Sequence, residues 1–169
     1  MKAYNGDAAL KTKLVGQIRR HREAEQLIKG TYWQGNEDGR GCAVGCLTHD
    51  PQGGHAKYET LWGIPQEFAH LEDAIFEALP AGEAQRWPER FLTAINPGAD
   101  LRPVWHRWAS ETLRLDLMTL DVVQARRDVL AALNQVADLH DRATTGKPPN
   151  ADEWGAAWVA AEAAGAAAW

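Results

Sequence analysis

Two cysteines and two histidines lie close together in this chain, and their side chains could bind a metal ion. Cys42, Cys46, His49 and His55 form the pattern Cys-x3-Cys-x2-His-x5-His. Thiolate and imidazole are the ligands of structural zinc sites, and the cysteine spacing falls within the range found there. Common sites separate their two ligand pairs by about a dozen residues, whereas only two residues separate Cys46 from His49. A zinc site here therefore requires one helical turn and one loop to wrap around the ion.

The same segment allows two other interpretations. A thiol at the start of a helix is acidified by the helix dipole, and Arg40 adds a positive charge nearby, so a nucleophilic cysteine with His49 or His55 as its base is one of them. The other is structural, because all residues from 41 to 46 except Val44 are small. Small residues are typical of places where two backbone segments pack closely. We favour this packing interpretation and keep the metal site as the alternative.

Length and composition favour an all-α fold. The 169 residues are 45% hydrophobic, which suffices for one sizeable core. Helix-forming Ala, Leu, Glu and Arg are abundant, while β-branched residues are sparse. We expect a helical domain of about six to seven helices at residues 1–146, a linker at 147–150 and an Ala/Trp-rich C-terminal helix at 151–169.

Helical spacing of hydrophobic residues defines the main elements. Residues 7–29 are expected to form the first helix, with Asp7 as its N-cap. A short helix is predicted for residues 55–62, and the clearest amphipathic helix has Pro65 in its first turn. Four acids fall away from its apolar positions and are expected to form a solvated face: Glu67, Glu72, Asp73 and Glu77.

Charge is distributed unevenly along the chain. The net charge is −5, yet residues 1–30 carry seven Lys or Arg against three acids. Such a basic segment docks on the acidic remainder of the chain or meets an acidic partner or a phosphate backbone. Because no aromatic residues interleave with these basic residues to stack on bases, nucleic acid is not an expected partner.

Cellular location follows from what the sequence lacks. No window is apolar over the length needed to cross a membrane, and the first residues do not contain the apolar stretch of a secretion signal. We therefore expect no membrane partner and a cytoplasmic location, where both thiols stay reduced.

Three tryptophans mark the C-terminal helix as a candidate partner-binding surface. At about 100° per residue, Trp154, Trp158 and Trp169 fall within an arc of roughly 60°. We expect this stripe to bind a protein partner or to mediate self-association, with docking on its own domain as the alternative. The helix reaches Trp169 without a stop signal, as a truncated chain would.

Four sequence blocks resemble a group of uncharacterised bacterial and phage proteins. They are Gly-Cys-Ala-Val-Gly-Cys at 41–46, Gly-Ile-Pro at 63–65, Leu-Glu-Asp-Ala-Ile-Phe-Glu-Ala-Leu-Pro at 71–80 and Trp-Pro-Glu-Arg-Phe-Leu at 87–92. The resemblance spans roughly residues 10–115 and implies a cytoplasmic or phage-encoded accessory protein with a long Ala-rich helix at its C-terminus. It implies no catalytic activity.

Common catalytic motifs are absent from the sequence. There is no Gly-rich phosphate loop, Gly-x-Ser-x-Gly turn or His-Glu-x-x-His helix. His140-Asp141 matches helical metal-dependent phosphohydrolases in that dipeptide alone, and His140 falls on an apolar seam. We therefore expect a non-enzymatic helical interaction or accessory protein without a cofactor. The alternative is a zinc-binding module or a metal-dependent hydrolase that uses Cys42, Cys46, His49 and His55.

Overall fold

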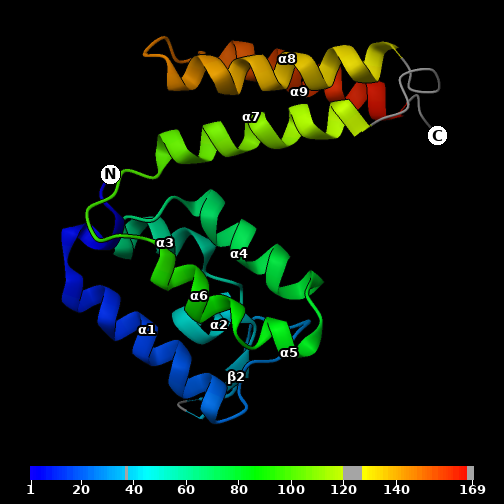
Figure 1. Ribbon diagram of the computed structural model, residues 1–169. Coiled ribbons are helices and arrows are strands. Elements are labelled where there is room, and N and C mark those ends of the chain that lie inside the picture. Colours follow the sequence, from blue (N-terminus) through cyan, green and yellow to red (C-terminus); the bar gives the residue numbers. More distant parts are fainter. Residues whose placement is uncertain (37, 120–126, 167–169) are drawn as a thin grey trace. The chain divides into compact units, whose positions relative to one another are not determined.

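The computed structural model describes residues 1–36, 38–119 and 127–166, and it is mostly helical (Figure 1). The all-α fold expected from composition is therefore confirmed. The described residues include one small antiparallel hairpin, in which β1 (Trp33–Gln34) pairs with β2 (Arg40–Gly41). The chain forms two compact units, Met1–Leu101 and Arg102–Trp169. The expected division into a domain at 1–146, a linker at 147–150 and a C-terminal helix stays a prediction.

The first unit is built around the short helix α2. Helix α1 packs against α2 and α6, and α4 packs against α2, α3 and α6. As a result every residue from 43 to 47 in α2 is buried. The helical segments of this unit are η1 (Ala3–Gly6), α1 (Ala8–Glu23), α2 (Ala43–Thr48), α3 (His55–Trp62), α4 (Gln66–Ala78), α5 (Ala81–Ala84) and α6 (Trp87–Ala94).

Helix α1 begins as expected and ends earlier than expected. The Asp7 carboxylate caps it by accepting a 2.7 Å hydrogen bond from the Ala9 N–H. The prediction of a helix over 7–29 is wrong at its C-terminal end, because the helix ends at Glu23. The following residues instead pair with β2: Ile28 N–H donates to the Gly41 carbonyl, and Gly41 N–H donates to the Gln26 carbonyl. Tertiary pairing here overrides the local helical pattern.

Two glycines allow the backbone around Tyr32 to approach β2 and α2. A Cβ atom at Gly41 would lie 1.7 Å from the Tyr32 carbonyl oxygen, and one at Gly45 would lie 1.4 Å from it. Real Cβ atoms do not approach so closely, so no residue with a side chain fits at either position in this backbone. The prediction that small residues at 41–46 permit close backbone packing is confirmed for these glycines.

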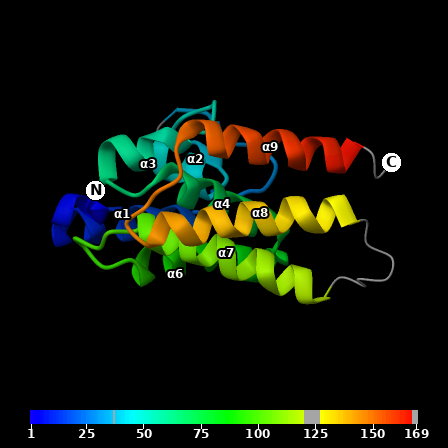
Figure 2. The ribbon, with the colours of Figure 1, turned by 90° about the horizontal axis from the view of Figure 1, so that it is seen from above.

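The second unit consists of α7 (Arg102–Thr119), α8 (Arg127–Thr144) and α9 (Ala151–Ala166). Helix α8 contacts both α7 and α9, and neighbouring helices run antiparallel (Figure 2). Buried alanines such as Ala137 and Ala157 allow close helix packing. No helix in the described part of the chain combines the length and hydropathy that a bilayer-spanning segment requires.

The tryptophans of α9 differ in their surroundings. Trp154 is half-buried, with its ring centroid 4.9 Å from that of His140 and 6.2 Å from that of His106. Trp158 is 67% exposed. Trp169, the third residue of the expected stripe, lies outside the described residues. The described portion therefore presents Trp158 to solvent while Trp154 packs within its own unit.

Candidate functional site

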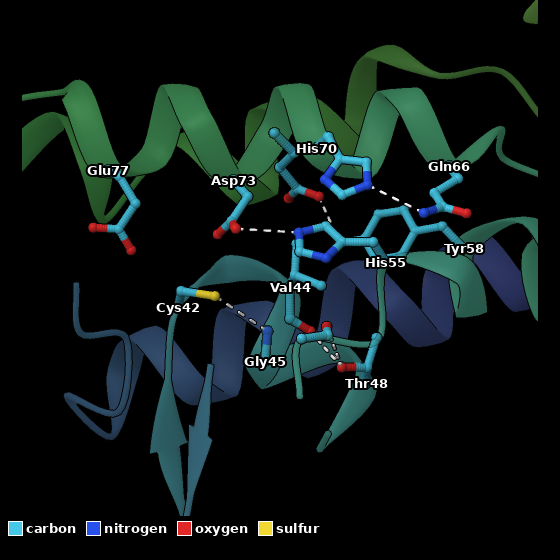
Figure 3. A network of polar contacts seen from close by, with 12 residues as sticks. Cys42, Val44, Gly45, Thr48, His55, Tyr58, Gln66, His70, Asp73 and Glu77 are labelled. Carbon is cyan, nitrogen blue, oxygen red and sulfur yellow. Dashed lines mark hydrogen bonds and ion pairs between the residues drawn. The ribbon is translucent and has the colours of Figure 1, made fainter. Parts of the chain in front are cut away.

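A cavity of about 540 Å³ in the first unit brings Cys42 together with acidic side chains. One part of its lining is the loop at residues 30–32 together with Pro51. The remainder is Cys42, at the start of α2, and two carboxylates of α4, Asp73 and Glu77. Figure 3 shows the cysteine facing the two carboxylates across the site.

Three potential ligand atoms converge in this cavity. One Sγ or carboxylate oxygen from each of Cys42, Asp73 and Glu77 lies within 4.8 Å of the other two. Asp73 and Glu77 are four residues apart on α4, so they occupy the same face of the helix. Within residues 1–36, 38–119 and 127–166, this is the group of three or more Cys, His, Asp or Glu residues that meets this distance.

Cys42 is held as a neutral thiol by its surroundings. It is the N-cap residue of α2, and its Sγ accepts a 3.5 Å hydrogen bond from the Gly45 N–H. The residue is only 1% exposed. Burial raises the pKa of the Cys42 thiol far above its usual range, the neighbouring Asp73 carboxylate raises it further, and the hydrogen bond from the Gly45 N–H lowers it by less. A free nucleophilic thiolate is therefore disfavoured at neutral pH.

Asp73 carries the clearest unsatisfied group of the site. Its Oδ2 accepts a 3.1 Å hydrogen bond from His55 Nε2. Its Oδ1 is buried and accepts no hydrogen bond in the geometry of the described residues, although the carboxylate lies close enough to raise the pKa of the Cys42 thiol. A buried carboxylate oxygen without a partner costs free energy that a bound cation would offset.

Glu77 is exposed and is held by the loop across the cavity. The Gly30 N–H donates to both carboxylate oxygens, at 3.0 and 3.1 Å. Lys29 Nζ donates to the backbone carbonyl of Glu77 at 3.0 Å. The loop and the helix are thus fixed together at the edge of the site.

His55 orients Asp73 and is itself held by aromatic contacts. Its ring stacks on that of His70 with centroids 4.1 Å apart and meets the edge of Tyr32 at 5.5 Å. Gln66 Nε2 donates to His70 Nε2 at 3.1 Å, which anchors the second ring. Burial and the neighbouring His55 lower the pKa of His70.

The four ligands predicted from sequence do not converge on one point. Cys46 Sγ donates to the carbonyls of Gly41 and Gln26, at 3.4 and 3.6 Å, and burial raises the pKa of the Cys46 thiol to about 12. His49 stacks on Trp33 with centroids 4.3 Å apart. Its Nε2 lies 3.2 Å from Nε2 of His21 on α1. Of the four, Cys42 belongs to the site and His55 contacts it through Asp73.

A buried acid beneath the site was missed in the sequence interpretation. The solvated face expected for α4 is wrong for Glu72, which is 0% exposed and accepts a 2.5 Å hydrogen bond from the Tyr58 hydroxyl. Burial raises the pKa of Glu72 to about 8, and the hydrogen bond from Tyr58 opposes this shift. Near neutral pH Glu72 is therefore mostly uncharged.

Comparison of the chain with protein-family models, curated proteins and solved structures finds no match. The resemblance to bacterial and phage proteins therefore stays a prediction. Function is inferred below from the chain's own geometry.

Proposed function

We propose that the first unit binds a divalent metal ion of the zinc class through Cys42, Asp73 and Glu77. The observation that carries this proposal is the convergence of the three ligand atoms within 4.8 Å at a cavity wall. The buried, unpaired Oδ1 of Asp73 supports it. A thiolate among the ligands favours zinc or another transition metal over magnesium or calcium.

The donor set fits such an ion in distance and charge. Zinc binds sulfur at about 2.3 Å and carboxylate oxygen at about 2.0–2.2 Å, which places neighbouring ligands roughly 3.5 Å apart. Side chains that already lie within 4.8 Å need only a small adjustment to reach this separation. A bound metal also deprotonates a coordinating thiol, which offsets the raised pKa of Cys42.

The cavity gives the proposed site room for an exogenous ligand. Three protein ligands with an open fourth position are typical of catalytic zinc, whereas structural zinc sites are closed by four protein ligands. A volume of about 540 Å³ falls in the range of small-molecule sites. Metal-assisted hydrolysis is the reaction class that this arrangement supports, with His55 positioning the Asp73 ligand.

Elemental analysis of protein purified without chelator tests the proposal. We expect about one zinc ion per chain in the wild type, and a loss of zinc affinity of about tenfold or more in Cys42→Ser and Glu77→Gln. Cys46→Ala and Glu67→Gln are matched controls, because they remove the second thiol and an exposed acid of the same helix. Wild-type protein that neither retains nor takes up stoichiometric zinc would contradict the proposal.

A second, separate proposal concerns the surface of α9. Trp158 and Val159 are 67% and 63% exposed, and exposed neighbouring apolar side chains favour a protein contact. We propose self-association through this helix. Sedimentation velocity over a range of concentrations should show oligomers of the wild type that are weakened in Trp158→Ala and kept in Trp108→Ala, which removes an exposed tryptophan of α7. A wild-type monomer at all concentrations would contradict this proposal.

A further inference from the structure

A second cavity of the first unit concentrates positive charge. It has a volume of about 580 Å³ and is lined by Arg22 of α1 and by residues of α6 and the segment just before it. Three arginines contribute to the lining: Arg22, Arg86 and Arg90. Its other lining residues are Glu89, Thr93 and Ala94.

The carboxylate that lines this cavity, Glu89, is already paired with arginines. Glu89 Oε1 accepts hydrogen bonds from Arg19 Nε at 3.0 Å and Arg19 Nη2 at 2.6 Å. Its Oε2 accepts a hydrogen bond from Arg22 Nη1. Bonding to Arg19 and the nearby Arg22 charge lower the pKa of Glu89, so it stays ionised and paired. Among the residues that the structure describes, no further carboxylate lines the cavity to neutralise the guanidinium groups of Arg86 and Arg90.

Arg86 and Arg90 are exposed, and neither forms an ion pair with a residue that the structure describes. They lie four residues apart, so their like charges occupy the same face and repel each other. Lys11 Nζ donates to the Thr93 carbonyl at 2.7 Å and brings another cation to the same region. The negative charge of Glu23 also acts on Arg19 and raises its pKa.

We propose that this arginine pocket, lined by Arg22, Arg86 and Arg90, binds a small phosphate-bearing molecule. Guanidinium groups present paired N–H donors that match the oxygens of phosphate, and a bound anion would relieve the repulsion between Arg86 and Arg90. A volume of about 580 Å³ suits a small ligand. The basic excess of residues 1–30 thereby acquires a role through Arg22, in a chain whose net charge is −5.

Isothermal titration of the full chain with pyrophosphate, at low ionic strength, tests this proposal. We expect binding of about one pyrophosphate per chain that is weakened about tenfold or more in the double variant Arg86→Gln/Arg90→Gln. Arg40→Gln is the control, because it removes one exposed positive charge outside the pocket and should bind as the wild type does. The Cys42→Ser variant should also bind normally, which separates this pocket from phosphate held by a metal.

Three results would overturn the proposal. One is a wild type that binds pyrophosphate no more tightly than the double variant does. Another is a loss of pyrophosphate affinity in Arg40→Gln as large as that in the double variant, which would indicate a general charge effect. The third is tight binding of a single-stranded oligonucleotide that pyrophosphate does not displace, which would assign the surface to nucleic acid. Far-UV circular dichroism verifies that the variants keep the fold, including Cys42→Ser, whose position is buried, unlike those of the three arginines.

Discussion

Replacing Gly45 with alanine is expected to destabilise the first unit by about 3 kcal/mol or more. The new Cβ would lie 1.4 Å from the Tyr32 carbonyl oxygen, and the contact is with backbone, which cannot move aside as a flexible side chain does. Overpacking in a buried site typically costs about 1–3 kcal/mol and sometimes more. Urea denaturation followed by far-UV circular dichroism measures the change in free energy of unfolding.

Gly82→Ala is the matched control for this substitution. Gly82 lies in α5, and a Cβ atom there would meet nothing within 4 Å. We therefore expect its free energy of unfolding to stay within about 0.5 kcal/mol of the wild type or to rise slightly. A Gly45→Ala protein as stable as this control would show that the Tyr32 backbone does not pack on α2 as described.

Glu72→Gln is expected to remove a large pH dependence of stability. The pKa of Glu72 is raised from the usual 4.5 to about 8 in the folded protein, so between these values the folded state holds a proton that the unfolded state has released. The stability that this proton contributes is fully present below about pH 4.5 and is lost as the pH rises toward 8. The slope is about 1.4 kcal/mol per pH unit for a single group.

The measurement is the free energy of unfolding at several pH values between 5 and 8 for the wild type and the variant. Glutamine keeps the size of the side chain and an oxygen that accepts the Tyr58 hydrogen bond. We therefore expect the free energy of unfolding of the variant to increase steadily relative to that of the wild type as the pH rises. Glu67→Gln, at an exposed position of the same helix, should follow the wild type. Parallel curves for Glu72→Gln and wild type would show that Glu72 is ionised in the folded state.

Several elements could be predicted from sequence because their signals are local. The expected helix over 55–62 coincides with α3 (His55–Trp62), which ends at Gly63 with a positive φ of 63°. The Asp7 cap and the helix after Pro65 are likewise found. Capping side chains, glycine and proline act within a few residues, so the chain itself reveals them.

The candidate site could be predicted only in part, because it depends on contacts distant in sequence. Cys42 was identified by its type, but the carboxylates that face it lie on α4, some thirty residues further along the chain. An amphipathic pattern separates apolar from polar faces and does not reveal that α2 packs beside the polar residues. The four-residue spacing of Asp73 and Glu77 can be read from the sequence, but it indicates a ligand site only once the fold places both residues opposite Cys42.

The glycines and the candidate site belong to one arrangement. Gly41 and Gly45 allow the Tyr32 backbone to pack on β2 and α2. This packing brings the loop at residues 30–32 to the cavity wall, where the Gly30 N–H holds Glu77. The small residues that favoured a purely structural interpretation therefore also position a proposed ligand.

Cobalt(II) substitution tests the proposed metal site most directly, because a cobalt–thiolate bond produces an intense charge-transfer absorption. We predict this absorption in wild type and in Cys46→Ala, its loss in Cys42→Ser and its weakening in Glu77→Gln. The account would be contradicted by a wild type that takes up cobalt without a thiolate band. It would equally be contradicted by a band that survives in Cys42→Ser and disappears in Cys46→Ala.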